Sequence, residues 1–220
     1  MTARGTLPLV AGILAGVLLI AAASALHARA AARLRPQLAE ELLYYPSGFM
    51  VRQASLGYET AAADLAWLRA IQYYGGHRMT DQKFDHIGHL MHVITELDPR
   101  FIQPYVFGAF VMAQEQRQPE RGLALLHRGM RANPDSWELA FKTGFLHYVC
   151  TKDYAAAARF FTRSARLPGH ADYAERFAAW TNQRAGNIGI AILLWREILA
   201  TGNEYMQEVA RRELRRLGAL

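Results

Sequence analysis

The sequence contains a single cysteine, Cys150, which excludes an intramolecular disulfide. It also lacks the short motifs of common catalytic centres: C-x-x-C-H for haem attachment, H-E-x-x-H for zinc, G-x-S-x-G and the Walker loop. We therefore expect no enzyme activity, no catalytic or metal-binding residues and no cofactor. The net charge is +6, but the arginines are scattered and no stretch resembles a nucleic-acid-binding module, so nucleic-acid binding is not expected.

What the chain does contain argues against disorder. Its 220 residues are 52% hydrophobic and 20% charged, and 10 Phe, 10 Tyr and 4 Trp can supply a large core. At this length we expect one domain with an appendage. Cys150 lies in an apolar helical pattern, which predicts a buried, unreactive thiol.

The appendage is an uncharged run over residues 7–26. As a helix rising about 1.5 Å per residue, it would span about 30 Å, the thickness of a hydrocarbon core. A signal peptide is the alternative, because Ala-Ser-Ala at 23–25 resembles a cleavage site. The length favours an uncleaved anchor, and we predict a single-pass protein of a bacterial inner membrane. Gly12 and Gly16 form a G-x-x-x-G pair that would permit a homodimer.

The charges around this run give conflicting indications of sidedness. Arg4 precedes it and Arg29, Arg33 and Arg35 follow it, which by the positive-inside rule keeps the main domain in the cytoplasm. The signal-like start indicates export instead. The prediction slightly favours the periplasmic side.

The remainder of the chain repeats with a period of about 35 residues. The clearest copy, residues 134–168, contains two helical patterns joined by a polar turn at 151–153. Pro99, Pro134 and Pro168 end successive copies, at separations of 35 and 34 residues. A period of this length predicts stacked helical pairs.

This pattern resembles the tetratricopeptide repeat, with its consensus W-x2-L-G-x2-Y, then A-x3-F, then P. Ala157 and Phe161 match the A-x3-F positions, as do Ala191 and Trp195 in the next copy. Other consensus positions are occupied by Trp67, Tyr74, Ile87, Met91, Phe107, Gly108, Gly122 and Leu126. The copies depart from the consensus at Pro104, Ala70-Ile71 and Asn203. The chain also resembles uncharacterised bacterial membrane-anchored proteins of this repeat family.

The uncharged run and the resemblance together predict an all-α fold, with an N-terminal transmembrane helix followed by an α-solenoid of about four helical pairs and a capping helix. The expected divisions are a short tail (1–6), a transmembrane helix or signal anchor (7–26), a juxtamembrane linker (27–56) and a repeat domain (57–217). The expected pairs are 59–74 with 81–97, 101–117 with 120–132, 137–150 with 154–167, and 171–184 with 188–199, before a cap at 204–217. The cap contains Arg211, Arg212, Arg215 and Arg216, which either form its polar outer face or contact lipid.

Three histidines have ligand-like spacing. His86, His89 and His92 are three residues apart in a predicted helix, so neighbouring imidazoles share a face. The repeat register buries Ile87 and Met91 and turns the histidines outward, where no further residues orient them. We expect a solvated stripe, with a metal or pH-sensing site as the alternative.

In this repeat family the first helices of successive pairs line a concave groove. The resemblance therefore implies a partner-binding groove formed by Arg69, Gln72, Tyr105, Ala109, Met112, Phe141, Lys142, Phe145, Tyr148, Tyr173, Arg176, Trp180 and Arg184. Its aromatic and basic side chains suit a partly apolar segment carrying carboxylates or a free C-terminus, although Phe145 and Trp180 can equally fill the superhelix. We expect a membrane-anchored scaffold that binds a partner protein, with a permanent subunit of a larger membrane complex as the alternative.

Overall fold

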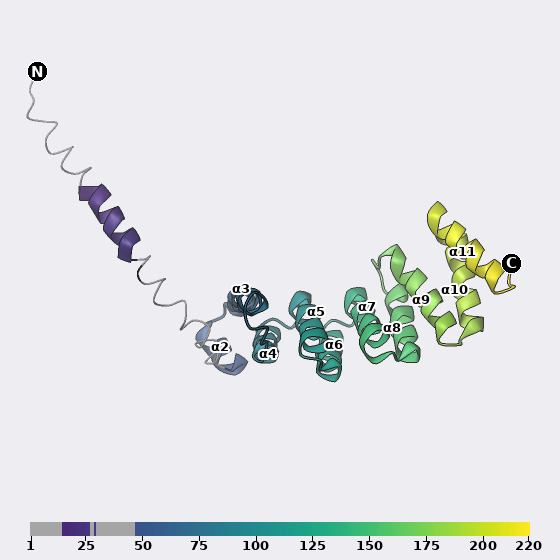
Figure 1. The fold of residues 1–220 in the computed structure, drawn as a ribbon, viewed down its shortest axis with the longest axis horizontal. Coiled ribbons are helices and arrows are strands. Elements are labelled where there is room, and N and C mark those ends of the chain that lie inside the picture. Colours follow the sequence, from purple (N-terminus) through teal and green to yellow (C-terminus); the bar gives the residue numbers. More distant parts are fainter. Residues whose placement is uncertain (1–14, 27–28, 30–46) are drawn as a thin grey trace, which may run out of the picture. The chain divides into compact units, whose positions relative to one another are not determined.

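The computed structural model describes residues 15–26, 29 and 47–220, and all of its described secondary structure is helical (Figure 1). The chain divides into two units, Met1–Tyr45 and Pro46–Leu220. In the first unit the helical residues are 15–26 and 29. The predicted all-α class is confirmed for the described residues.

The predicted transmembrane helix over residues 7–26 has to be corrected. Among the described residues, no helix is both long enough and apolar enough to cross a membrane. Residues 15–26 would span about 18 Å as a helix, against about 30 Å for a hydrocarbon core; residues 7–14, including Gly12 of the predicted dimer pair, lie outside the described residues. The predicted single pass through a bacterial inner membrane depended on this helix and is corrected with it.

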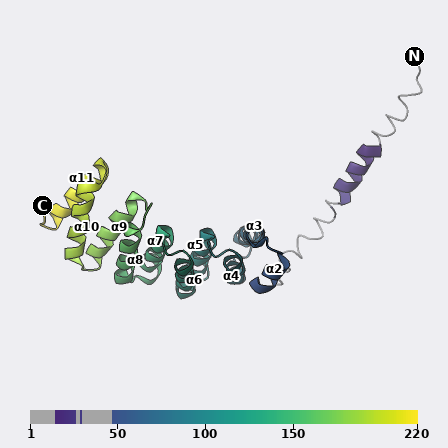
Figure 2. The same cartoon turned by 180° about the vertical axis from the view of Figure 1, so that it is seen from behind.

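Residues 47–220 form a short helix, four helical pairs and a final helix (Figures 1 and 2). The short helix is α2 (Gly48–Ala54). The pairs are α3 (Glu59–Arg78) with α4 (Ile87–Leu97), α5 (Ile102–Phe110) with α6 (Pro119–Ala132), α7 (Trp137–Leu146) with α8 (Tyr154–Arg166), and α9 (Asp172–Arg184) with α10 (Ile188–Thr201). The final helix is α11 (Glu204–Arg216), and α5 and α7 continue as π-helical turns, η2 (Val111–Glu115) and η3 (His147–Thr151).

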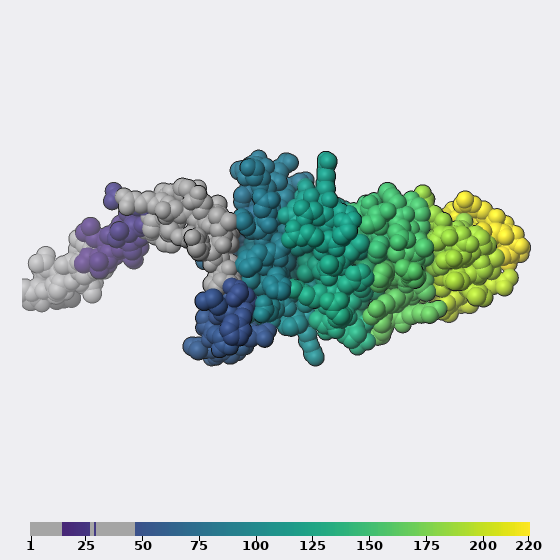
Figure 3. All heavy atoms as spheres, turned by 90° about the horizontal axis from the view of Figure 1, so that it is seen from below, coloured from purple at the N-terminus to yellow at the C-terminus, as the bar shows by residue number. Residues whose placement is uncertain are grey.

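Helices of this second unit pack mainly on their neighbours in sequence. Figure 3 shows the same order on the surface, where residues follow one another in successive bands from blue to yellow. Because each pair contacts only nearby helices, the arrangement is compatible with an α-solenoid.

The backbone repeats at the turn inside each pair. Gln82, Arg117, Lys152 and Gly186 all adopt positive φ, between 56° and 84°, and are 35, 35 and 34 residues apart. Each lies in the connection between the two helices of its pair, where a left-handed residue commonly ends a helix. The sequence period is therefore also a period of backbone conformation.

The first pair differs most from its predicted boundaries. Helix α3 continues through Gly75 and Gly76, and α4 begins only at Ile87 instead of residue 81. The Tyr73 hydroxyl donates to the Lys83 carbonyl oxygen at 3.2 Å, so the intervening chain is held as a turn.

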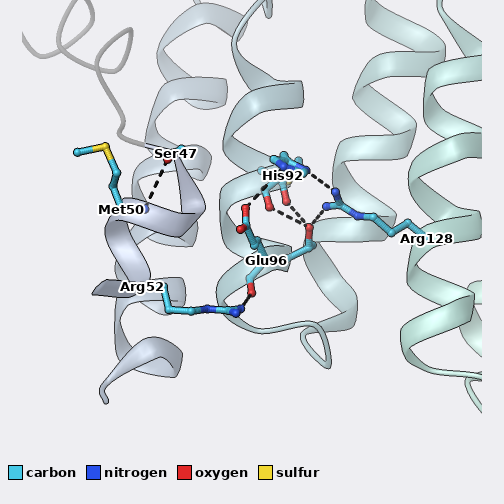
Figure 4. Close-up of polar contacts among 8 residues, drawn as sticks. Ser47, Met50, Arg52, His92, Glu96 and Arg128 are labelled. Atoms are coloured by element: carbon cyan, nitrogen blue, oxygen red, sulfur yellow. Dashed lines mark hydrogen bonds and ion pairs between the residues drawn. The ribbon is translucent and has the colours of Figure 1, made fainter. Parts of the chain in front are cut away.

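Helix α2, within the predicted linker, belongs to the second unit. The Ser47 hydroxyl caps it by accepting from the Met50 amide at 3.5 Å. The Arg52 guanidinium donates to the main-chain oxygen of Glu96 (Figure 4), and Gly48 is buried against the Glu96 side chain. These contacts attach α2 to α4.

Small residues set the spacing between paired helices. A Cβ added to Gly122 of α6 would lie 2.5 Å from the carbonyl oxygen of Ala109 in α5. In the next pair, a Cβ on Gly144 would lie 3.0 Å from Phe161 and 3.2 Å from the carbonyl oxygen of Ala157. Both pairs therefore depend on main chains approaching without an intervening side chain.

The turn between α8 and α9 is closed by His170. Its Nδ1 lies 2.8 Å from the carbonyl oxygen of Leu167, and its Nε2 lies 3.0 Å from Oε1 of Glu175. The hydrogen bond with Glu175 raises the pKa of His170 above its ordinary 6.5; partial burial opposes this change, and the bond to Leu167 reinforces it. When protonated, His170 donates to both oxygens and ties the start of α9 to the end of α8.

Gly122→Ala is expected to lower the free energy of unfolding by about 1–3 kcal/mol, because the added methyl group meets a main-chain oxygen that cannot rotate away. Gly189→Ala in α10 is the matched control: nothing lies within 4 Å of its added Cβ. Since alanine favours a helix, that change should leave stability unaltered or raise it by up to about 1 kcal/mol. Urea denaturation followed by circular dichroism measures both, and equal midpoints would contradict the close approach of α5 and α6.

A second prediction concerns pH. Because the folded-state pKa of His170 is raised, its contribution to stability is complete below about pH 6.5 and is lost as the pH rises through the raised value. Glu175→Gln should return the pKa of His170 toward 6.5, as measured by NMR titration of the imidazole. His127, whose pKa is lowered by burial, is the internal control and should titrate identically in both proteins. An unchanged His170 titration would refute the assigned contact.

Candidate partner-binding surface

Four of the predicted groove residues lie in the core: Tyr105, Ala109, Met112 and Phe141. The Tyr105 hydroxyl is turned inward and donates to the carbonyl oxygen of Pro99 at 3.3 Å. The Phe141 ring lies 5.0 Å from that of Phe161 and 5.3 Å from that of Phe177. These residues hold successive helices together and are not available to a partner.

Two more of the predicted residues, Arg69 and Gln72, are exposed on α3 but do not face α5. The side of α3 that meets α5 carries Trp67 and Tyr74, whose rings lie 5.4 Å and 5.0 Å from that of Phe107. Arg69 and Gln72 therefore do not lie on the side of α3 that meets α5.

The remaining predicted residues come together on α7, η3 and α9. We name this the aromatic–basic surface, and it consists of Lys142, Phe145, Tyr148, Tyr173, Arg176, Trp180 and Arg184, with Tyr154 from α8. Tyr173, Trp180 and Arg184 are exposed, and the others are half-buried. Unlike the core set, all of them present part of the side chain to solvent.

Arg184 organises one end of this surface. Its guanidinium carbon lies 4.8 Å from the ring centroid of Tyr154, 5.7 Å from that of Tyr148 and 5.8 Å from that of Trp180. The rings of Tyr148 and Trp180 are themselves 5.6 Å apart. Cation–π attraction thus holds side chains from η3, α8 and α9 in a fixed cluster.

The other end reaches the preceding pair through Phe145 and Lys142. The ring of Phe145 lies 5.9 Å from that of Phe110, and Nζ of Lys142 lies 6.0 Å from the Phe110 centroid. Aromatic and basic groups therefore alternate across three successive first helices.

A hollow of about 300 Å³ adjoins the aromatic–basic surface where α9, α10 and α11 meet. Its lining consists of Arg176, Phe177, Trp180, Trp195, Tyr205, Val209, Arg212 and Glu213. Arg176 donates to the Tyr205 hydroxyl at 3.3 Å and joins α9 to α11. The hollow thus combines apolar walls with the guanidinium groups of Arg176 and Arg212.

The predicted groove includes neither Tyr205 nor Arg212, because residues 204–217 are predicted to form a cap or a lipid-contacting helix. A signal was nevertheless present. Helix α11 follows α10 as α9 follows α8, so it continues the series of first helices. If α11 is counted as a further first helix, the predicted groove also includes Tyr205 and Arg212.

The histidines share no common site. His86 is half-buried, and its ring lies 6.1 Å from that of Tyr73. The imidazole of His92 contacts the Arg128 guanidinium and lies 3.6 Å from the Glu96 carboxylate (Figure 4). Within residues 15–26, 29 and 47–220, no group of three or more His, Cys, Asp or Glu side chains could hold a metal ion.

Cys150 and His147 lie together on η3 without forming a reactive pair. Burial raises the pKa of the Cys150 thiol, so the thiol stays protonated at neutral pH. Burial also lowers the pKa of the His147 imidazole, which is therefore neutral. The pair offers no thiolate for nucleophilic chemistry.

Comparisons with known proteins assign this chain to no family: no family model matches it, and no curated protein matches it. The aromatic–basic surface and the adjoining hollow remain the features from which a function can be inferred.

Proposed function

We propose that this protein is a tetratricopeptide-repeat-like interaction module that binds a partly apolar, acidic segment of another protein across the aromatic–basic surface. The observation that carries the proposal is the half-exposed cluster of Tyr148, Trp180 and Arg184. Such residues dominate the binding energy of many protein interfaces.

The repeat assignment is supported by geometry and sequence together. Four helical pairs recur with left-handed residues at the same point of each turn. The consensus pair Ala157 and Phe161 is fully buried in α8, and Ala191 and Trp195 occupy equivalent buried positions in α10. Small residues at the close approach and large residues between pairs are the physical requirements of this repeat.

The chemistry of the surface indicates an acidic ligand. Lys142, Arg176, Arg184 and Arg212 all lie on or beside it, and a guanidinium group can bind a carboxylate through two hydrogen bonds. Glu213, which lines the hollow, is already 3.6 Å from the Arg216 guanidinium. The positive groups therefore outnumber the negative ones where a ligand would approach.

The shape of the surface indicates that part of the ligand is apolar. Trp180 and Tyr173 expose ring area to water, and the hollow between α9 and α11 is walled by Phe177, Trp195 and Val209. Covering these groups with a ligand's apolar side chain would release water from apolar surface. The arginine contacts already fix the rings, so binding would lose little side-chain freedom.

The test is a selection of random displayed peptides on the full-length protein. The selected peptides should carry Asp or Glu beside aromatic or aliphatic residues. Trp180→Ala should weaken their binding by about 30-fold, which corresponds to the loss of about 2 kcal/mol typical of a central interface residue. Fluorescence anisotropy of a labelled selected peptide measures the dissociation constant, and the same variants apply to any native partner.

Two controls accompany this measurement. Arg159→Glu reverses an exposed charge on α8, away from the aromatic–basic surface, and should leave affinity within about twofold. Arg184→Glu should weaken binding as Trp180→Ala does, because it places a carboxylate against the acidic ligand. If the selected peptides bind Trp180→Ala and Arg184→Glu as tightly as the unaltered protein, this surface is not the binding site.

A further inference from the structure

Helix α3 leaves one face without a partner among the described residues. Its opposite side is buried, with Ala63, Ala66, Ala70 and Tyr73 at most 5% exposed. On the open face, Leu65 is 64% exposed and Leu68 is 58% exposed. Large apolar side chains that are exposed side by side on a helix commonly mark an interaction surface.

The exposed residues follow the spacing of a coiled-coil seam. Alternating steps of three and four residues connect Tyr58, Ala61, Leu65, Leu68, Gln72 and Gly75. All six are exposed. In heptad notation Leu65 takes position a and Leu68 takes position d, the two positions that pack between paired helices.

Two opposite charges flank this seam. Asp64 takes position g, and Arg69 takes position e of the next heptad, five residues later. Both are exposed, and within the described part of the chain neither makes a hydrogen bond or an ion pair. Each therefore has its charge available to a neighbouring molecule.

The positions of Asp64 and Arg69 favour a second copy of α3 as the partner helix and a parallel orientation of the two helices. In a parallel helix pair, the g side chain of one helix lies beside the e side chain of the other helix, five residues further on. Two parallel copies of α3 would thus place Asp64 beside Arg69 of the other copy, twice across a two-fold axis. An antiparallel pair would bring g to g and e to e, and so place like charges together.

We propose that this face of α3 is a homodimer interface, in which α3 of one copy packs in parallel on α3 of a second copy. Leu65 and Leu68 form its apolar layers, and the two Asp64–Arg69 pairs set the register. Helix α4 contacts the opposite, buried side of α3, so that side stays covered in the dimer. Because the seam is only about two heptads long, the dimer should be concentration-dependent.

The interface is independent of the aromatic–basic surface, which lies on α7, η3 and α9 with Tyr154 of α8. Dimerisation does not require the proposed peptide binding. It would, however, place two such surfaces in one assembly, so that a partner with two acidic segments would bind with higher avidity.

Cysteine crosslinking in the full-length protein tests the geometry. In a Cys150→Ser background, Leu68→Cys places a thiol at a d position, and d positions of parallel helices face each other across the two-fold axis. Mild oxidation should give a disulfide-linked dimer on a non-reducing gel. Arg159→Cys, an exposed position on α8, is the control and should stay monomeric at the same concentration.

A charge exchange tests the register by sedimentation equilibrium. Asp64→Arg places like charges at both crossings and should weaken association about tenfold, whereas Asp64→Arg combined with Arg69→Asp should restore it. The exchange is specific for α3, so it excludes association through Gly12 and Gly16. The proposal fails if Leu68→Cys crosslinks no better than Arg159→Cys, or if the double variant associates as weakly as Asp64→Arg. If a different partner or another segment of this chain covers this face of α3, Leu68→Cys will crosslink no better than Arg159→Cys.

Discussion

The close approach of main chains inside the two central helical pairs, α5–α6 and α7–α8, is the contact on which the rest of the second unit depends. Gly122 lets α6 reach the Ala109 carbonyl of α5, and Gly144 lets α7 reach Ala157 of α8. At this spacing Phe161 and Trp195 fill the space between pairs and become almost fully buried. A single pair cannot bury its apolar faces alone, so each pair is stabilised by the next.

The same dependence makes the ends of the stack different from its middle. Helix α11, the last helix of the stack, has exposed arginines at 211, 212, 215 and 216. At the other end of the stack, no described helix packs on the face of α3 that carries Leu65 and Leu68. Helix α2 packs chiefly on α4, and the two leucines stay exposed. An unpaired apolar helix face is the condition under which a stacked architecture associates with another copy or with a partner.

Aromatic residues of the first helices either pack in the core or form the aromatic–basic surface, and their burial determines which of the two roles they have. Phe141 of α7 packs against α8 and α9, whereas Tyr148, seven residues further on in η3, reaches solvent beside Trp180. Cation–π contacts from Arg184 keep the exposed rings ordered without burying them. The surface is therefore continuous with the core, and a ligand would meet rings that the fold already holds in place.

The sequence by itself determined the all-α class, the period of about 35 residues and the packing positions such as Ala157 and Trp195, because helical periodicity and residue size are local properties of the chain. Only the tertiary structure decided which groove residues are exposed: Tyr105 and Phe141 share the register of Tyr148 and Trp180 but are buried by neighbouring pairs. The tertiary structure also decided the short helix α2 and the π-helical turns. It decided the positive φ of Gln82, Arg117 and Lys152 as well, because none of these residues is a glycine, the residue type that usually marks a left-handed position. Helix α2 depends on a contact between residues distant in sequence, that of Arg52 with Glu96, and local pattern does not contain it.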